Sequence, residues 1–357
     1  MTGPAILIVG AGATGLSVGY HLDLAGAEIT FLVRPGTAAR AAPPTRLYCY
    51  DDASLATFTG YRVVESVTEL GAGGFDFVVI TFDGHTARTP HGQDTLRAIG
   101  EFIAPDKTTV IMCGFGLGVR EHHVRTLGIA AERVLHGFVG LLAHQGSADL
   151  PVHPPADRDQ VRESAVAYRH PGNRVGFRLD TTDPVAAKAF AALYDRCGVS
   201  RCALTSPQMD KLFSTVGFAV YAACDLAGWP DFTTMAADRP LWKLACRAQR
   251  EIAALPEHGW RGKLMAIVMG PRVTRAIHTG AEKGYRPLDY QAFNRFHHGG
   301  KVRHQDIDSL RECLESGRRQ GKPMKALTAL LQRLDAADEI TPTASGRPAA
   351  ARSEPEP

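Results

Sequence analysis

Short apolar runs alternate with segments of helical periodicity through the first half of the chain. The runs are rich in β-branched and aromatic residues. They predict strands at Ile6–Val9, Ile29–Val33, Phe77–Thr81, Thr109–Cys113, Val134–Val139 and Val175–Leu179. Helical or loop segments separate these strands, and such alternation is typical of an α/β fold.

The pattern changes to helices alone after Ser206. Just before that point, Asp183–Cys197 is predicted as an amphipathic helix, because Asp183 can cap it and Pro184 suits its first position. Further helices are predicted at Pro207–Leu226, Pro240–Leu255, Gly262–Val268, Asp289–Phe296, Gln305–Gln320 and Met324–Ala336. We therefore expect a sheet-containing domain (residues 1–204), a helical domain (205–336) and a flexible tail (337–357).

The first predicted strand runs directly into a glycine-rich turn, GAGATG, which opens a helix that ends near Gly26. In such a turn Gly10 allows the tight bend, Gly12 lets the backbone approach a pyrophosphate, and Gly15 permits close packing of helix on strand. The phosphates then face free N–H groups at the helix N-terminus. This context predicts a Rossmann dinucleotide-binding domain. The contacts expected from the turn are Gly10, Gly12, Ala13, Thr14 and Gly15.

The end of the second strand indicates which dinucleotide is bound. NAD and FAD sites usually have an acidic residue there, but this chain has Arg34 after Val33. A guanidinium suits a 2′-phosphate through paired, charge-assisted hydrogen bonds. NADP is therefore expected in preference to NAD. Arg40 or Arg46 is either a second phosphate contact or a solvated loop cation.

Composition agrees with a two-domain enzyme of the cytoplasm. The 357 residues are 45% hydrophobic, which allows a sizeable core, and the net charge of +3 is too small to indicate nucleic acid binding. The sequence has no apolar run of about 18 residues and no signal peptide, so no membrane span is expected. Seven widely spaced cysteines without a C-x-x-C pair indicate reduced thiols.

The chain resembles the ketopantoate reductases (2-dehydropantoate 2-reductases) over about residues 5–335. The segments that carry the resemblance are ILIVGAGATG at 6–15, VIMCGFGLG at 110–118, SPQMDKLFSTVGFAV at 206–220 and HHGGKVRHQDIDSL at 297–310. The resemblance implies a Rossmann domain followed by an all-helical domain of the 6-phosphogluconate-dehydrogenase type. It also implies that NADPH, in contact with Phe82 and Gly114, and a 2-oxo acid share the cleft between the two domains.

The resemblance also assigns two catalytic residues. The family lysine, which donates a proton to the substrate carbonyl or orients it, falls on Lys211, and Asp306 replaces the family glutamate that bonds the substrate hydroxyl. Reduction of a carbonyl by hydride creates an alkoxide, so a proton donor or a cation is required within hydrogen-bond reach. Asp306 and Asp308 have a structural alternative, since both favour a helix N-terminus.

Several substrate positions of the family carry other residues in this chain. Cys113 stands where the family has an asparagine that contacts substrate and nicotinamide. Ala219 and Asp83 replace a further asparagine and a lysine. The substrate-binding positions that the resemblance implies here are Cys113, Thr215, Asn294 and Asp306. The identity of the substrate does not follow from them.

Adjacent histidines occur at residues 122–123 and 297–298. Side chains at i and i+1 diverge on a helix, and neither an H-E-x-x-H motif nor a cysteine partner accompanies them, so no metal site is expected. A cationic segment beside Asp306 comprises His297, His298, Lys301, Arg303 and His304. This segment either attracts an anionic substrate or is a solvated loop.

Three classes of function are compatible with the sequence. We favour an NADPH-dependent reductase of a small, anionic 2-oxo acid or a related carbonyl or imine, with ketopantoate as the leading substrate. A flavoprotein is the second class, because GAGATGLSVGYHL also resembles the opening of FAD-dependent oxidoreductases. The third is a non-catalytic NADP-binding homologue, since several polar substrate positions are lost. The oligomeric state stays open, with a homodimer as one option.

Overall fold

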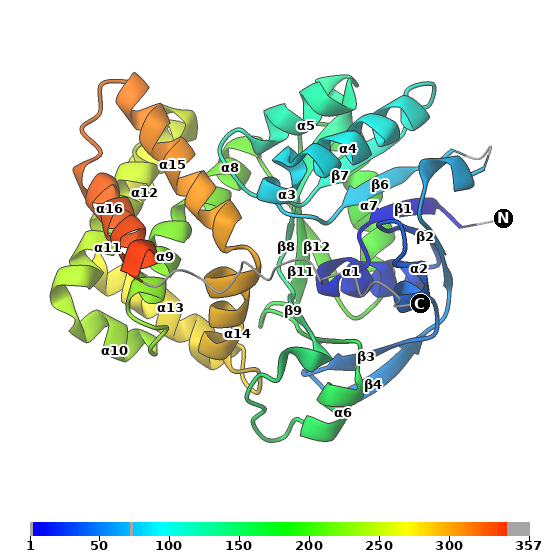
Figure 1. Cartoon of the computed structure of the whole chain (residues 1–357), viewed down its shortest axis with the longest axis horizontal. Helices are drawn as coiled ribbons and strands as arrows, with labels where there is room; N and C mark the ends of the chain where they lie inside the picture. Colours follow the sequence, from blue (N-terminus) through cyan, green and yellow to red (C-terminus); the bar gives the residue numbers. More distant parts are fainter. Residues whose placement is uncertain (1–2, 72–73, 341–357) are drawn as a thin grey trace, which may run out of the picture.

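The computed structural model describes residues 3–71 and 74–340 of the chain. A sheet-containing region forms one side of the molecule and a group of helices forms the other (Figure 1). The predicted change from strands to helices is confirmed, because β12 ends at Thr205 and α8 begins at Pro207. No strand follows in the described part of the chain.

The larger sheet has eight strands and includes all the predicted ones. In spatial order they are β12 (Arg201–Thr205), β11 (Val175–Asp180), β8 (Val134–Val139), β7 (Thr109–Met112), β6 (Phe77–Ile80), β1 (Ala5–Val9), β2 (Glu28–Leu32) and β5 (Tyr61–Val64). β8 and β11 are antiparallel, and the other neighbours are parallel. The sequence did not predict β5 and β12.

Helices cover both faces of this sheet, because its central strands are apolar on both sides. Ile6, Leu7 and Ile8 of β1 are all fully buried, although successive side chains of a strand point to opposite faces. The helices are α1 (Ala13–Leu24) and α7 (Pro184–Asp195) on one face, and α4 (Pro90–Ile103) and α5 (Val119–Leu127) on the other. This is the doubly wound arrangement that the alternating pattern predicted.

A second sheet of four strands was not predicted. In spatial order its strands are β4 (Ser54–Phe58), β3 (Thr45–Cys49), β10 (Val166–Arg169) and β9 (Leu142–Gln145). β3 and β10 are parallel neighbours, with Leu47 opposite Val166. Such short strands, with several polar residues, depend on partners far along the chain, so local patterns do not reveal them. Two short helices, α2 (Ala38–Ala41) and α6 (Arg158–Glu163), lie in the connections around this sheet.

The second region consists of helices and contains most of those predicted. They are α8 (Pro207–Val216), α9 (Phe218–Leu226), α10 (Phe232–Ala237), α11 (Arg239–Ala253), α12 (Gly259–Val268), α13 (Pro271–Gly284), α14 (Tyr290–Phe296), α15 (Arg303–Arg319) and α16 (Lys325–Ile340). The helix predicted over 207–226 is interrupted at Gly217, and α10 and α13 were not predicted. α16 continues past residue 336, where we expected the tail to begin, and residues 341–357 lie outside the described part.

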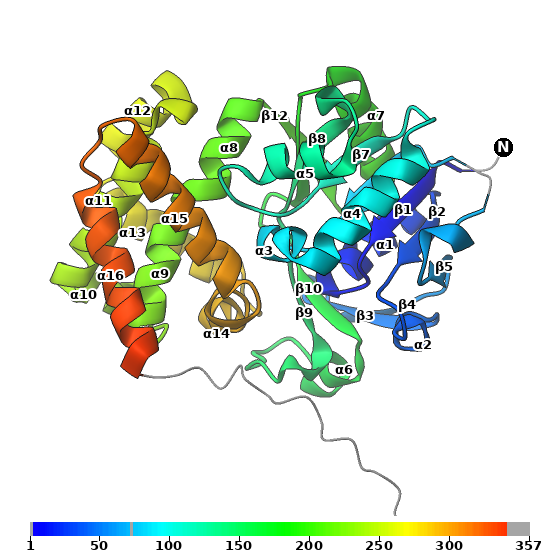
Figure 2. The ribbon, with the colours of Figure 1, turned by 45° about the horizontal axis from the view of Figure 1, so that its top comes forward.

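α15 connects the two regions, because it lies beside the short helix α3 (Gly84–Arg88) at the edge of the larger sheet (Figure 2). Gln305 Oε1 accepts the backbone N–H groups of Gly84 at 2.7 Å and of Phe115 at 2.8 Å. Arg88 and Glu312 form an ion pair further along the same two helices. The start of α15 is thereby held at the carboxyl ends of β6 and β7, the edge where open α/β sheets bind ligands.

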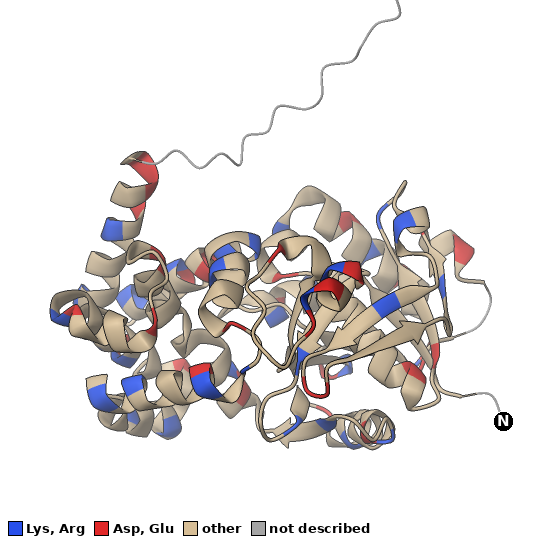
Figure 3. Ribbon diagram, turned by 90° about the horizontal axis from the view of Figure 1, so that it is seen from below, with Lys and Arg blue, Asp and Glu red and all other residues tan. Residues whose placement is uncertain are grey.

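Charge does not distinguish the two regions. Lys and Arg are interspersed with Asp and Glu over both of them (Figure 3). The seven cysteines are free thiols. Among the described helices, none combines the length and apolar character that crossing a membrane requires.

Candidate functional site

The order of the strands places a crevice beside β1. The chain leaves β1 toward β2 on one side, and β6 lies on the other side. Gly10 follows β1 and Thr81 follows β6, and the Thr81 hydroxyl donates to the carbonyl of Val9 at 2.9 Å. Ligands of open α/β sheets bind at such a switch point. A cleft of about 1190 Å³ begins here and extends to the helical region.

The glycine turn fits a dinucleotide. Gly10 has φ of +101°, a backbone conformation that favours glycine, and a Cβ on Gly15 would overlap the Gly10 carbonyl oxygen. A Cβ on Gly12, in contrast, would meet no atom within 4 Å. Gly12 also caps α1 without a side-chain hydrogen bond to the helix N–H groups. Those N–H groups therefore face open space in the cleft, where a pyrophosphate can accept them.

All five residues that the sequence predicted from this turn line the cleft, including Ala13 and Thr14. Beyond them the wall carries Arg34 and Arg40, both exposed, and the described residues form no ion pair with either guanidinium. Arg46 is not part of this wall, since its Nη1 lies 2.8 Å from Glu163 Oε2. Of the two candidates for a second phosphate contact, only Arg40 lies at the cleft.

Glu65 also lines this end of the cleft and was not predicted. Its Oε1 accepts the N–H of Ala38 at 2.6 Å. Hydrogen bonds from the backbone of Gly36 and Ala38 lower the pKa of its carboxyl group. Glu65 therefore shapes the loop that follows Arg34. Its position after β5 gave no local signal, because β5 itself was not predicted.

The middle of the cleft contains two predicted residues, Phe82 and Cys113. Burial raises the pKa of the Cys113 thiol to about 12, so this group is neutral and is not a nucleophile. Gly114, which was predicted to touch the cofactor, does not line the cleft. Its carbonyl oxygen lies 3.0 Å from Nε2 of His136.

Lys211, predicted as a catalytic residue, lies beside the cleft without lining it. Its Nζ lies 3.4 Å from Glu121 Oε1 on α5. Thr215, one helical turn later, is fully buried and hydrogen-bonds the Lys211 carbonyl at 3.0 Å. The side of α8 and α9 that does face the cleft begins with Phe213 and Ser214. Successive residues of a helix are about 100° apart, so a shift of one position along α8 decides whether a side chain faces the cleft.

Asp210, the neighbour of Lys211, points toward the sheet. Its Oδ2 lies 2.5 Å from Nδ1 of His136, and both side chains are buried. Burial alone would lower the pKa of His136, but the Asp210 carboxylate outweighs that effect and raises it. The pair fixes the start of α8 against β8 and β7. Neither side chain lines the cleft.

The far end of the cleft is formed by α14 and the segment after it. Asn294 is buried, lines the cleft and donates from Nδ2 to the Tyr290 carbonyl at 2.8 Å. His298 and Lys301 also line the cleft. They belong to a single π-helical turn, His297–Lys301 (η5 in the order of elements). Part of the cationic segment predicted from the sequence therefore faces the ligand space.

Asp306, predicted to touch the substrate, also lies away from the cleft surface. Its side chain is buried and does not line the main cleft. Asp306 Oδ2 lies 2.7 Å from Nδ1 of His298 instead. Asp308, for which a structural role was an alternative, pairs with His85 Nδ1 at 2.7 Å on the surface. The carboxylate predicted to touch the substrate thus touches a histidine that lines the cleft.

Aromatic residues complete the far end and were not predicted as site residues. Tyr221, Tyr285 and Tyr290 all line the cleft, and the hydroxyls of Tyr221 and Tyr290 lie 3.3 Å apart. The Tyr221 ring stacks on His298, with centroids 4.1 Å apart. Their spacing along the chain resembles that of ordinary core residues, so only the assembled fold distinguishes them.

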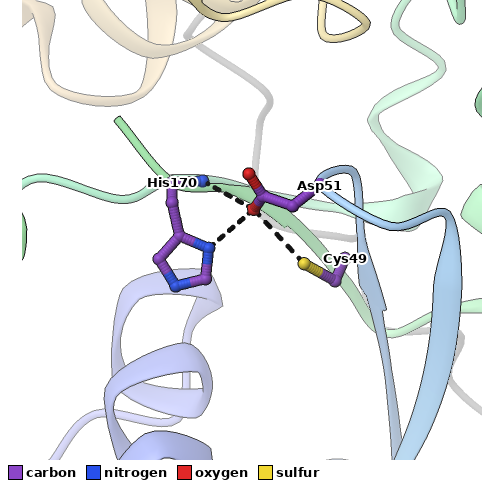
Figure 4. A group of neighbouring side chains, drawn as sticks. All are labelled: Cys49, Asp51 and His170. Atoms are coloured by element: carbon purple, nitrogen blue, oxygen red, sulfur yellow. Dashed lines mark hydrogen bonds and ion pairs between the residues drawn. The ribbon is translucent and has the colours of Figure 1, made fainter. Parts of the chain in front are cut away.

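A separate cluster of Cys49, Asp51 and His170 lies outside the cleft (Figure 4). Asp51 Oδ2 accepts His170 Nδ1 at 2.6 Å and lies 3.4 Å from Cys49 Sγ. Arg169 forms an ion pair with the same carboxylate. Burial raises the pKa of the Cys49 thiol to about 12. The ligand atoms are therefore engaged in hydrogen bonds that join the β3–β4 turn to the end of β10, and the cluster is a structural one.

Comparisons with known proteins agree with this geometry. Residues 6–153 match the family model of the ketopantoate reductase PanE/ApbA. No curated protein matches the chain in sequence.

Solved structures resemble the whole chain. A 2-dehydropantoate 2-reductase from Geobacter metallireducens is 19% identical with a TM-score of 0.65, over 93% of this chain and 99% of that one. D-mandelate dehydrogenase in complex with NADH is 13% identical with a TM-score of 0.61, over 94% and 99%. A dimeric ketopantoate reductase from Staphylococcus aureus is 13% identical with a TM-score of 0.60, over 94% and 99%.

These similarities agree on one fold, a Rossmann domain followed by a helical domain. The N-terminal region, residues 6–153, is thus similar to the ketopantoate reductase PanE/ApbA family, and the described chain has the fold of solved 2-dehydropantoate 2-reductases.

Proposed function

We propose that this protein is an NADPH-dependent reductase of a small 2-oxo acid. The observation that carries the proposal is the continuity of one cleft. It begins at the glycine turn, passes Phe82 and Cys113, and ends at His298 and Lys301. A dinucleotide that binds along the first part would present its nicotinamide near the second.

The cofactor would be held by backbone and charge at the sheet end. The N–H groups of the first turn of α1 would donate to the pyrophosphate, and Arg34 and Arg40 would bind the 2′-phosphate that distinguishes NADP from NAD. When bound, the reduced nicotinamide supplies a hydride. Glu65 keeps the loop after Arg34 folded through its backbone hydrogen bonds.

The substrate would be held at the helical end. Lys301 is a cation on the cleft wall, and it forms no ion pair within residues 3–71 and 74–340. Desolvation by the surrounding protein lowers the pKa of the Lys301 ammonium group, and the Asp83 carboxylate opposes this shift. A carboxylate of a 2-oxo acid is the complementary partner for such a group. Asn294 lies on the same wall, with one of its two amide N–H groups donated to the Tyr290 carbonyl.

The test is oxidation of NADPH and NADH by the purified full chain with ketopantoate, benzoylformate and pyruvate. We expect NADPH oxidation with at least one of these acids, and binding of NADPH that is tighter than that of NADH. Tight NADPH binding without turnover over a wider set of carbonyl compounds and imines would favour the non-catalytic alternative. Absence of NADPH binding would overturn the proposal.

A further inference from the structure

Among the described residues, five histidines each have a ring nitrogen within hydrogen-bond distance of an aspartate oxygen. The pairs are His85–Asp308, His136–Asp210, His153–Asp289, His170–Asp51 and His298–Asp306. Only the histidine of the last pair lines the cleft. Histidine is a common general acid, because its ordinary pKa lies near working pH. In such sites one ring nitrogen is hydrogen-bonded to a carboxylate and the other faces the ligand.

The buried His136–Asp210 pair shows what a purely structural arrangement looks like in this chain. Its Nδ1 faces Asp210 and its Nε2 faces the Gly114 carbonyl, so both ring nitrogens have a protein partner. His298 differs in this respect. Its Nδ1 faces Asp306, and Nε2 has no partner among the described residues and is not enclosed by protein. One nitrogen of His298 is therefore free for a ligand.

Two contacts hold the ring of His298, and the turn that carries the ring is itself closely packed. Asp306 holds its Nδ1 at 2.7 Å, and Tyr221 stacks on one face. The π-helical turn that carries it has Gly299 against Trp229, where a Cβ would lie 2.6 Å from the indole nitrogen. π-helical turns are rare and occur frequently at functional sites. The ring is thus positioned before any ligand arrives, as efficient proton transfer requires.

The charged groups around His298 come from several elements. Lys301 and His297 belong to the same π-helical turn, and burial lowers the pKa of His297 well below its usual value. The Asp225–Arg303 ion pair lies behind the ring, next to Asp306. Asp83 faces this group from the sheet region. Burial raises the pKa of Asp306, an effect that His298 opposes.

We propose that His298 is the proton donor to the substrate carbonyl oxygen, and that Asp306 is its positioning residue. The inference rests on the proposed function. In the forward step the Nε2–H bond of the imidazolium breaks and an O–H bond forms, while the hydride from the reduced nicotinamide forms the new C–H bond and the carbonyl π pair moves to oxygen. The neutral imidazole then takes a proton from water. One 2-oxo acid, one hydride and one proton yield one 2-hydroxy acid.

This assignment agrees with the positions of the predicted residues. Lys211 pairs with Glu121 and does not line the cleft. Asp306 acts through His298 and does not need contact with the substrate. Lys301, on the same turn as His298, is left to bind the carboxylate.

The first test is single-turnover hydride transfer from NADPH to the best 2-oxo acid. We expect His298→Asn to lower the rate by about 10²–10⁴-fold, the range for a positioned acid, with NADPH affinity unchanged. The matched control is His85→Asn, which removes the exposed member of another His–Asp pair outside the cleft. It should transfer hydride at the rate of the unmodified chain.

The second test does not depend on turnover. In the cofactor-free protein labelled with ¹⁵N-histidine, the His298 signals, assigned by their loss in His298→Asn, should report the Nδ1–H tautomer when neutral. Asp306→Leu removes the acceptor that orients Nδ1, so the neutral ring should lose this preference and populate both tautomers. In the active enzyme kcat should fall, with KM for the acid little changed, and Asp306→Glu should restore more of kcat than Asp306→Leu.

The outcomes separate the inference from the proposed function. Lack of NADPH oxidation by the unmodified chain with any 2-oxo acid would overturn the proposed function, and the donor role with it. If the unmodified chain is active, an unchanged rate in His298→Asn would overturn the donor role alone. An unchanged tautomer preference of His298 in Asp306→Leu would overturn the positioning role of Asp306.

Discussion

At the sheet end of the cleft, the residues that face the ligand are neighbours in the chain and act mainly through their backbone. Gly10 to Gly15 form one turn, and the N–H groups of α1 need no particular side chain. At the helical end, the ligand meets side chains of α9, α14 and the π-helical turn, which only the packed fold brings together. A backbone site tolerates sequence divergence, whereas a side-chain site changes with single residues.

This contrast agrees with where the chain matches and departs from the pattern of the ketopantoate reductases it resembles. The glycine turn is intact, but Cys113 and Ala219 stand at positions where the resemblance implies asparagine. At the helical end, His298 and Lys301 line the cleft, where the proposed reduction would use the one as proton donor and the other as cation. Cofactor and substrate specificity can therefore diverge separately within one cleft.

The largest expected effect is a loss of NADPH affinity at the sheet end of the cleft. Gly12→Val would place its side chain in the open space in front of α1, where no protein atom lies within 4 Å of a new Cβ. We expect NADPH affinity to fall by about 100-fold, or ~2.7 kcal/mol, with little change in thermal unfolding. Isothermal titration and a thermal melt measure the two quantities.

The control for that experiment is Gly280→Val. Gly280 lies on the exposed side of α13, and a Cβ there also meets no atom within 4 Å. It should leave NADPH affinity unchanged. Equal NADPH affinity in Gly12→Val and the unmodified chain would show that the phosphates do not lie against the glycine turn.

The next prediction concerns the side-chain end. Lys301→Met should raise KM for the 2-oxo acid by about 10–100-fold, because hydrogen bonds to charged groups contribute roughly 1.5–3 kcal/mol. NADPH affinity should change little. Lys211→Met is the matched control, since Lys211 pairs with Glu121 away from the cleft. Steady-state kinetics in which Lys211→Met, and not Lys301→Met, raises KM would reverse the assignment.

A smaller effect is expected for cofactor choice. Arg34→Ala should weaken NADPH binding by about tenfold, or ~1.4 kcal/mol, and leave NADH binding unchanged, because only NADPH carries the 2′-phosphate. Arg46→Ala is the control, as Arg46 pairs with Glu163 instead of lining the cleft. The assignment fails if both dinucleotides bind the unmodified chain equally well.

The smallest expected effect is on the stability of the fold and involves His278, a buried histidine of the helical region. His278 on α13 stacks on Phe232, with centroids 4.5 Å apart, and burial lowers its pKa from 6.5 to about 4. Because the unfolded chain binds the proton first, the stability that neutral His278 contributes is present above pH 6.5 and is lost as the pH falls toward 4. The loss between pH 6 and pH 5 should be about 1 kcal/mol.

Chemical denaturation at the two pH values measures this loss. His278→Leu should reduce the difference between them, whereas hydride transfer should keep the rate of the unmodified chain, since His278 does not line the cleft. An identical pH dependence of unfolding in His278→Leu would contradict the buried, neutral state of this side chain.

Several parts of the fold could be predicted because their signals are local. The strand before Gly10, the helix cap at Asp183 and the break after Ser206 each depend on residues within a few positions of one another. Asp183 Oδ1 does accept the N–H groups that a cap should bind. The four-stranded sheet could not be predicted in this way, since β3 pairs with β10 far along the chain.

The residues of the candidate site also differ in whether local sequence could predict their positions. The glycine turn, the arginine that follows β2 and the cationic segment after α14 could be read from the amino-acid order alone, because backbone geometry and charge at these points depend on neighbouring residues. Packing of the whole chain was needed to turn Lys211 toward Glu121 and to bring Asp306 to His298. The cause is helical rotation: about 100° per residue separates a side chain in the cleft from one outside it, and contacts between distant helices set that angle.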